Sequence, residues 1–104
     1  MRTGTTDLGH VQLVGRLDAR GAAAARDALH SALAAGDGEL VVDLSRVELL
    51  DAIGLGVLVD VQRRAGLDGR RMVLHGAPPR IARLLRVTRL HRLFAMESAA
   101  AVPA

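Results

Sequence analysis

Three aspartates and one histidine are the residues of this chain best suited to acid–base or metal chemistry. Asp18, Asp43 and His75 lie at or just beyond the ends of predicted strands, and Asp51 precedes a predicted helix. Carboxylates that meet a histidine at one edge of a sheet can hold a divalent cation or transfer protons. The same residues have simpler uses, because Asp51 is a good helix cap, Asp18 a good turn residue and His75 a strand-end histidine with a backbone partner.

The remaining parts of an active site are missing from the sequence. The chain has no cysteine and no lysine. This excludes thiolate metal sites, cysteine nucleophiles, phosphate-binding loops that need a lysine and receiver-like phospho-aspartate sites. No nucleophile and base stand at a defined spacing either. We therefore expect no enzyme activity, no metal site and no cofactor.

The composition predicts a single folded domain over residues 1–104. Half of the residues are hydrophobic and 24% are charged, which argues against disorder. One Phe and no Tyr or Trp leave no aromatic platform on which nucleic-acid bases could stack. The first residues lack an apolar signal sequence, and no apolar run could cross a bilayer, so we expect a cytoplasmic protein. Residues 1–9 are expected to be a variable segment and residues 98–104 a frayed tail.

Positive charge is concentrated in the C-terminal half of the chain. Residues 1–52 contain five Arg against eight acidic residues, a net charge of −3, whereas residues 53–104 contain nine Arg against three, a net charge of +6. Arginines recur at every third position from 80 to 92, which places them along one helix face. Such a face is either simply solvated or attracts an acidic partner, a phosphate or a membrane surface. Because no helix-turn-helix pattern accompanies it, nucleic-acid binding is only a minor hypothesis.

The hydrophobic pattern predicts an α/β fold. Strands are expected at 10–17, 40–44, 72–75 and 93–96, and helices at 22–35, from 55 to 66, and from Pro78 onward. Leu55, Leu58, Val59 and Gln62 are expected to form the packed face of the second helix. Alternation with short loops predicts a mostly parallel sheet of four to five strands packed with helices. Because ligands bind beyond the carboxyl ends of such strands, residues 18–20, 45–54 and 75–77 should share one rim.

Residues 15–18, 42–45, 50–56, 78–85 and 93–94 carry five short motifs. In this order they resemble the STAS domain of bacterial anti-sigma factor antagonists (anti-anti-sigma factors). Gly15-Arg16-Leu17-Asp18 is similar to the family's Gly-x-Leu-Asp, and Val42-Asp43-Leu44-Ser45 to its next strand and turn. Leu50 to Gly56, with Asp51-Ala52-Ile53-Gly54 at its centre, resembles the Asp-Ser-Ser-Gly-Leu-Gly signature. Pro78-Pro79 and the apolar residues that follow resemble the last helix, and Leu93-Phe94 the closing strand. The resemblance covers almost the whole chain.

The resemblance implies a STAS fold and a binding module in bacterial transcription regulation. In the family, the unphosphorylated domain binds an anti-sigma factor that is also a serine kinase, and so frees the sigma factor. Phosphorylation of the second Ser of Asp-Ser-Ser-Gly breaks that complex. Such a phosphate adds about two negative charges to a closely packed surface.

The chain departs from this pattern at the position of the phosphate acceptor. Ile53 occupies the acceptor position and Ala52 the position before it, so neither side chain has an oxygen. The sequence therefore predicts that phosphorylation does not switch this site. Ser45, Thr88 and Ser98 are alternative acceptors, although each is more simply a cap or turn residue.

Two further departures concern the ends of the fold. Arg89 replaces a glycine that the family often has after the residue matched by Thr88, which changes the end of the last helix. The segment before His10 is shorter than the family's, so the sequence does not decide whether the family's first, antiparallel strand is present.

The resemblance places a partner-binding surface on the rim. Ile53 and Leu55 are expected to supply apolar contact, Asp18 and Asp51 polar orientation, and Gly54 and Gly56 close approach. The alternative is a non-switching STAS scaffold, or a regulatory subunit of a signalling or transporter assembly. The oligomeric state stays open. The full expected contact set is Asp18, Arg20, Asp51, Ala52, Ile53, Gly54, Leu55 and Val57.

Overall fold

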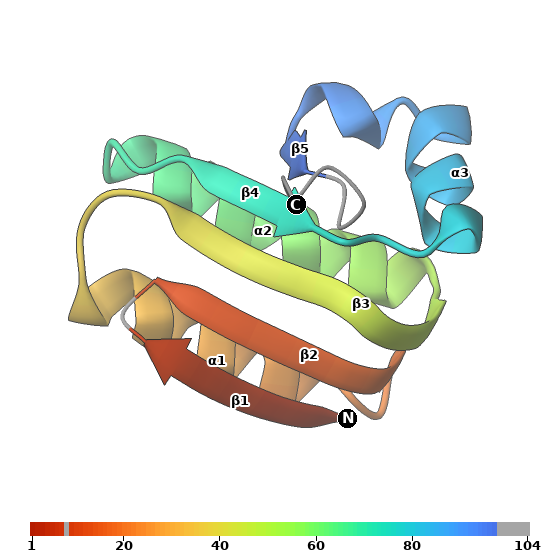
Figure 1. Ribbon diagram of the computed structural model, residues 1–104, viewed down its shortest axis with the longest axis horizontal. Helices are drawn as coiled ribbons and strands as arrows, with labels where there is room; N and C mark the ends of the chain where they lie inside the picture. The colour runs from red at the N-terminus through yellow and green to blue at the C-terminus, as the bar shows by residue number, and fades with distance from the viewer. Residues whose placement is uncertain (8, 98–104) are drawn as a thin grey trace, which may run out of the picture.

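The fold is built on a five-stranded, mostly parallel sheet, seen in a computed structural model that describes residues 1–7 and 9–97. The strand order is β1-β2-β3-β4-β5, with β1 antiparallel to β2 and every other pair parallel (Figure 1). The predicted fold class is therefore confirmed. The strands are β1 (Arg2–Asp7), β2 (His10–Leu17), β3 (Leu40–Leu50), β4 (Met72–His75) and β5 (Ala95–Glu97).

The N-terminal segment is part of this sheet, because β1 pairs with β2 from Arg2↔Val14 to Asp7↔His10. The antiparallel strand that the short N-terminus left open is therefore present. At the other end of the chain, β5 begins at Ala95, two residues later than expected. The predicted tail, residues 98–104, lies outside the described residues, as does the alternative acceptor Ser98.

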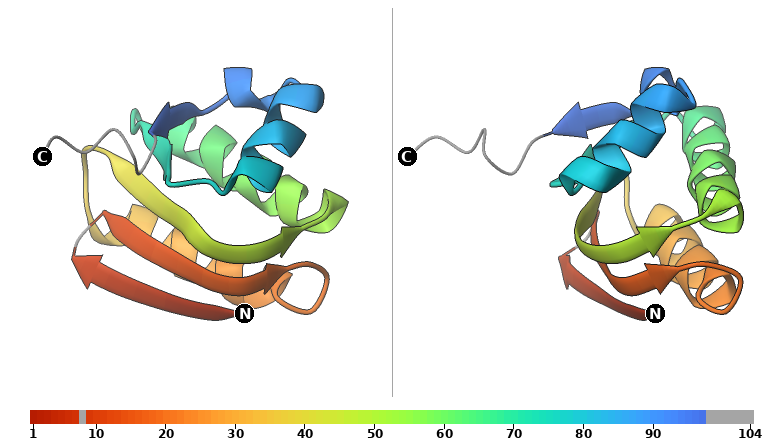
Figure 2. Two further views of the ribbon diagram at one scale, coloured as in Figure 1. Left: turned by 45° about the vertical axis from the view of Figure 1, so that its right-hand side comes forward. Right: turned by 90° about the vertical axis from the view of Figure 1, so that its right-hand side faces the viewer.

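Two long helices cover one face of the sheet, and a third joins the last two strands. Helices α1 (Ala22–Ala35) and α2 (Ala52–Leu67) lie side by side behind the sheet in Figure 1. Helix α3 (Pro79–Val87) and the 3-10 turn η1 (Leu90–Arg92) connect β4 to β5 (Figure 2). Among the described residues, no helix is long and apolar enough to cross a bilayer.

The core fills the space between the sheet and the two long helices. Period-two alternation turns Val11, Leu13 and Leu17 of β2 toward α1 and α2, where they are fully buried. Helix α2 contributes residues 54, 57, 58, 61 and 65, a stripe of helical spacing. The predicted packed face was wrong in part, since Leu58 is buried whereas Leu55 and Val59 are only half-buried. Apolar residues surround the first turns of α2 on all sides, so periodicity alone does not fix its orientation.

Strand β3 runs six residues beyond its predicted end at Leu44. Its register with β2 shifts twice, between the pairs Gln12↔Asp43 and Val14↔Arg46 and again before Arg16↔Leu49. Each shift places one extra residue in β3, which is a bulge, and the alternation of buried and exposed residues is lost after Leu44. Residues 45–50 therefore looked like a loop in the sequence. The rim begins at Asp51 instead of Ser45.

Arg70 is a buried anchor that no local sequence pattern predicts. Its side chain, only 7% exposed, donates hydrogen bonds to backbone carbonyl oxygens. The shortest reach Leu33 (2.8 Å), Gly38 (2.9 Å) and Ala32 (3.1 Å). These carbonyls belong to the last turn of α1 and the connection to β3, where a helix favours a positive charge. Arg70 thus fixes the α1–β3 connection, at the end of the sheet opposite the rim.

Candidate functional site

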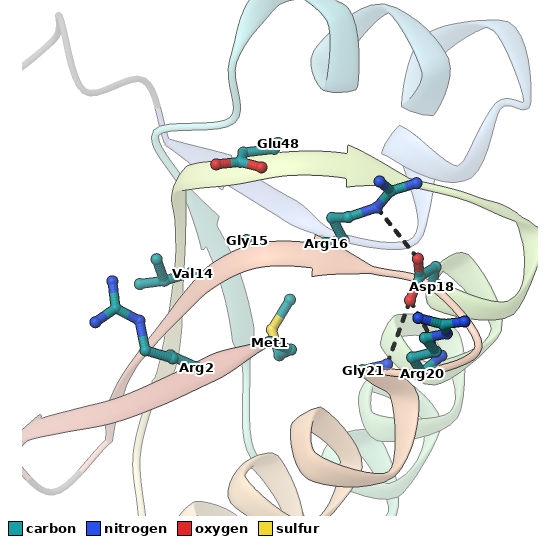
Figure 3. Close-up of a pocket in the computed structure, with 9 residues that line it drawn as sticks. All are labelled: Met1, Arg2, Val14, Gly15, Arg16, Asp18, Arg20, Gly21 and Glu48. Carbon is teal, nitrogen blue, oxygen red and sulfur yellow. Dashed lines mark hydrogen bonds and ion pairs between the residues drawn. The ribbon is translucent and has the colours of Figure 1, made fainter.

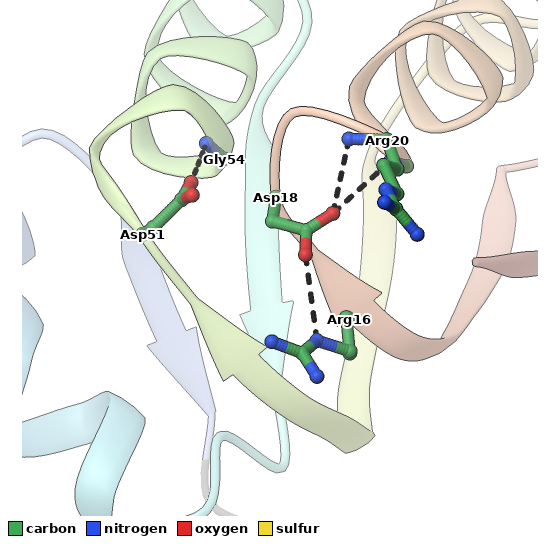
Figure 4. A network of polar contacts seen from close by, with 6 residues as sticks. Arg16, Asp18, Arg20, Asp51 and Gly54 are labelled. Atoms are coloured by element: carbon green, nitrogen blue, oxygen red, sulfur yellow. Dashed lines mark hydrogen bonds and ion pairs between the residues drawn. The ribbon is translucent and has the colours of Figure 1, made fainter.

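The first part of the site is the Asp18 loop, residues 18–21, which follows β2. The Asp18 carboxylate accepts hydrogen bonds from the backbone N–H groups of Arg20 (3.0 Å) and Gly21 (3.3 Å) and pairs with Arg16 Nε at 3.4 Å (Figure 4). Burial by itself would raise the pKa of Asp18, but the hydrogen bonds from Gly21 and Arg20 and the nearby Arg16 charge lower it below its ordinary value. Asp18 is therefore an ionised turn residue that holds the loop in shape.

The second part of the site is the α2 entrance, residues 51–56. Asp51 caps α2, because its Oδ1 accepts a hydrogen bond from Gly54 N at 2.9 Å. The Asp51 N–H in turn donates to the carbonyl oxygen of Leu17 at 3.4 Å. Leu17 and Leu50 are register partners, so Asp18 and Asp51 each follow one member of a strand pair. The two aspartates therefore lie on one rim, as predicted, and both organise backbone.

Gly54 and Val57, two of the expected contact residues, face the interior. Val57 is fully buried in the core, so its expected place on the contact surface is wrong. Gly54 is also buried, and a β-carbon there would lie 2.1 Å from the carbonyl oxygen of Leu17. Gly54 therefore packs closely against β2 of its own chain, and the expectation that it approaches a partner is wrong. Gly56 has open space where a side chain would stand.

Ile53 is the most conspicuous side chain of the rim. It is 50% exposed, and the preceding Ala52 is also exposed. The structure therefore places an apolar side chain on an accessible surface, as the sequence hypothesis requires. Covering the exposed half of this side chain contributes roughly half of the 1.5–3 kcal/mol gained by burying a fully exposed one.

A shallow depression beside Ile53, which we call the Ile53 groove, extends this apolar surface. Its volume is about 610 Å³. The apolar lining comes from α2 and η1, and the charged lining includes an ion pair between Arg26 and Asp60, whose Nε and Oδ2 atoms are 3.8 Å apart. The groove therefore offers apolar and charged side chains together, as protein–protein contacts do. The lining residues are Arg26, Ile53, Leu55, Gly56, Val59, Asp60, Arg63 and Leu90.

A second hollow lies on the other side of the Asp18 loop, between β1, β2 and the start of α1 (Figure 3). Its volume is about 780 Å³, and Arg2, Arg16 and the exposed Arg20 all line it. Asp18 and Glu48 add two carboxylates to the lining. The hollow therefore carries charges of both signs beside apolar side chains.

Asp43 and His75 belong to a different surface. They are register partners on the sheet face that lies opposite α1 and α2, in a row with Gln12 and Glu97. Asp43 accepts hydrogen bonds from Ser45 N (2.9 Å) and Gln12 Nε2 (3.4 Å), and His75 Nδ1 lies 2.8 Å from Glu97 Oε1. The partners Gln12 and Glu97 were missed, because their proximity depends on strand register. The candidate acid–base set is thus divided between two surfaces.

The environment of Asp43 is that of a structural carboxylate. Burial would raise the pKa of Asp43, but hydrogen bonds from Ser45 and Gln12 and the charge of His75 together lower it below its ordinary value. Among the side chains that the structure describes, no three His, Asp or Glu residues converge as a metal site would require.

The alternative phosphate acceptors have local roles where the structure describes them. Thr88 Oγ1 donates to the carbonyl oxygen of Leu84 at 2.8 Å at the end of α3, as expected for a cap. Ser45 lies within β3, and its N–H binds Asp43. Arg89 adopts the left-handed conformation with φ 62°, which glycine adopts without strain.

Comparison with known proteins finds one matching family and several solved structures with a similar fold. A family described as "Mlab, STAS domain" matches residues 2–96. A putative anti-sigma factor antagonist from Thermotoga maritima is 23% identical, with a TM-score of 0.78 over 94% of this chain and 86% of that one. An anti-sigma factor antagonist from Mycobacterium paratuberculosis is 28% identical, with a TM-score of 0.70 over 92% and 82%. The anti-sigma factor antagonist SpoIIAA in its unphosphorylated form is 16% identical, with a TM-score of 0.68 over 96% and 88%.

Proposed function

The chain belongs to the STAS domain family, and from this premise we propose that it is an anti-sigma factor antagonist. In this proposal the rim binds an anti-sigma factor of the serine-kinase type in the cytoplasm and thereby frees a sigma factor. The observation that carries the proposal is the exposure of Ile53, at 50%, on the first turn of α2. Solved anti-sigma factor antagonists of the same fold support it. The role is binding, and no catalytic step is assigned to the chain.

The proposed contact surface consists of the accessible members of the expected set. Ile53 and the half-buried Leu55 supply apolar contact, and the exposed Ala52 and Arg20 flank them. Asp18 and Asp51 hold the two segments in place through their backbone hydrogen bonds. Gly54 and Val57 are buried and contribute indirectly, because they pack α2 against the sheet. A small apolar centre with polar neighbours is sufficient for specific association.

We also propose that phosphorylation does not switch this surface. Ile53 and Ala52 offer no oxygen to a kinase at the position where the family carries its acceptor serine. The phosphate would have introduced about two negative charges on the same rim as the Asp18 and Asp51 carboxylates. Without it, the surface stays competent to bind, and control of the interaction rests on another input.

Titration of the cognate anti-sigma factor against Ile53→Asp tests the proposal. The variant places a charge in the apolar centre, so we expect the dissociation constant to rise by about 30-fold or more, which corresponds to at least ~2 kcal/mol. Leu67→Asp is the matched control, because Leu67 is exposed (83%) on the last turn of α2, far from the rim, and should leave the affinity unchanged. Equal affinity of wild type and Ile53→Asp, with both folded, would refute the proposed surface.

The same missing hydroxyl groups favour a second candidate, a constitutive scaffold or regulatory subunit of a signalling or transporter assembly. A domain that is always competent to bind suits a permanent complex as well as a transient one. Purification with crosslinking through the rim separates the two. Recovery of an anti-sigma kinase supports the first candidate, and recovery of a membrane transporter or sensory complex supports the second.

A further inference from the structure

A second groove lies between the end of β3 and α3, away from the Ile53 groove. Its volume is about 320 Å³, and its lining is mostly apolar. We call it the α3 groove. Ile81 and Leu50 form its buried floor, whereas Leu49 (37% exposed) and Val87 (72% exposed) stand at its surface. The lining residues are Glu48, Leu49, Leu50, Arg80, Ile81, Arg83, Leu84 and Val87.

Helix α3 has more apolar surface than its own packing uses. In its nine residues, Ile81 and Leu85 are buried in the core, while Leu84 is half-buried and Val87 faces solvent. Leu49 of β3 adds to this surface from the other side of the groove. Exposed apolar side chains that gather in one concave place, instead of being scattered, are typical of an interaction site.

The border of the α3 groove is strongly positive. Arg80 and Arg83 line it, and Arg86 follows on the same helix. Within the part of the chain that the structure describes, none of these three guanidinium groups lies within 4.0 Å of a carboxylate, whereas other arginines do pair, as Arg26 does with Asp60. Glu48 is the single acidic residue of the lining. The groove therefore offers an apolar floor and unneutralised cations spaced three residues apart.

We propose that the α3 groove docks an acidic amphipathic helix of a protein partner. The partner helix would insert two or three aliphatic side chains into the groove and face Arg80 and Arg83 with carboxylates at helical spacing. A nucleic acid would leave the apolar floor uncovered, and a flat lipid surface would not reach into a concave slot. Charge complementarity of this kind raises the association rate and selects against basic partners. The site shares no lining residue with the Ile53 groove, so it goes beyond the function proposed above.

The test uses two synthetic helical peptides with leucines at positions i, i+3, i+4 and i+7. One carries glutamates on its remaining face, and the other carries lysines there. We expect the glutamate peptide to bind, measured by fluorescence anisotropy, and to shift the amide NMR signals of Leu49, Leu84 and Val87. The lysine peptide should bind at least about tenfold more weakly.

Three variants locate the peptide on the protein. Arg80→Glu combined with Arg83→Glu should weaken binding at least about tenfold, because both border charges are reversed. Arg46→Glu, a charge reversal in β3 outside the groove, is the matched control and should bind as wild type. Ile53→Asp should also bind as wild type, so that failure of this inference and failure of the proposed function are distinguishable.

Several results would overturn the inference. These are no binding of the glutamate peptide, equal binding of the two peptides, or shifts that centre on Ile53. Arginine-dependent binding to phosphatidylglycerol vesicles without peptide binding would show a lipid surface instead. Arginine-dependent binding to duplex DNA without peptide binding would show a nucleic-acid surface.

Discussion

Gly54 lies so close to the carbonyl oxygen of Leu17 that a β-carbon on Gly54 would stand 2.1 Å from it. This contact seats the first turn of α2 directly on the end of β2. The Asp51 cap, and the hydrogen bond that the Asp51 N–H donates to the same Leu17 carbonyl, also hold this turn in place. Ile53 is therefore held outward by its neighbours, and its exposure is a consequence of how α2 is seated.

Gly54→Ala should destabilise the protein. The added methyl group meets a backbone oxygen that cannot move without disturbing the sheet, and we expect a loss of about 1–3 kcal/mol in the free energy of unfolding, measured by urea denaturation. Gly56→Ala is the control, because nothing lies within 4 Å of a β-carbon there and alanine favours the helix. Gly56→Ala should be neutral or slightly stabilising. Equal effects of the two substitutions would contradict the close packing of Gly54 on Leu17.

Arg70→Met should also destabilise the fold, at the end of the sheet opposite the rim. The substitution keeps most of the aliphatic volume but leaves carbonyl oxygens of α1 and of the α1–β3 connection without their donor. We expect a loss of about 2–4 kcal/mol in the free energy of unfolding. Arg71→Met removes a neighbouring arginine whose side chain is exposed and pairs with Glu39 at 3.4 Å, and should cost under about 1 kcal/mol. If Arg70→Met lowers the free energy of unfolding by less than about 1 kcal/mol, water has replaced the guanidinium as the donor to these carbonyl oxygens.

Arg89→Gly should stabilise the protein. Arg89 has φ 62°, a conformation that is unfavourable for a residue with a β-carbon and natural for glycine. We expect a gain of up to about 1 kcal/mol, because the relief of strain exceeds the additional freedom of glycine in the unfolded chain. Arg89→Ala separates the loss of the arginine side chain from the backbone effect, since alanine keeps the strain. If Ala and Gly stabilise equally, backbone strain is not the cause.

Asp43 makes stability depend on pH at the acidic end. Its pKa in the folded protein lies below the ordinary value of 3.8, so the folded state binds its proton less readily than the unfolded state. The resulting stabilisation is fully present above pH 3.8 and is lost as the pH falls through the folded pKa. Asp43→Asn should therefore flatten the fall of the unfolding free energy below pH 4. A carboxyl ¹³C titration of Asp43 with a midpoint above 3.8 would contradict this.

The sequence was sufficient for the architecture and for the part of the rim around Asp18 and Asp51, whereas residues 45–50 lie in β3 and His75 lies on another surface. Helical spacing, strand alternation and five short motifs predicted the mostly parallel sheet, the Asp51 cap and the Asp18 turn. They did not predict the orientation of α2, because apolar residues surround its first turns. The close packing of Gly54 against the Leu17 carbonyl decides which of these apolar residues face the core. Val57, which was expected on the contact surface, faces the core for this reason.

Contacts between segments that are distant in the sequence could not be predicted either. Arg70 reaches carbonyls more than 30 positions away, and nothing in its neighbours distinguishes it from Arg71. The row of Gln12, Asp43, His75 and Glu97 depends on a register with two bulges. Such pairings depend on the register of all strands in the sheet, and no local sequence pattern predicts that register.

The most direct test of a surface without a phosphate switch is to incubate the complex of this chain and its cognate anti-sigma kinase with ATP. Intact mass and size-exclusion chromatography then report modification and association. We predict that the wild-type mass stays unchanged and the complex persists, whereas Ile53→Ser gains one phosphate and dissociates. A phosphate on the wild-type chain that releases the kinase would contradict the account.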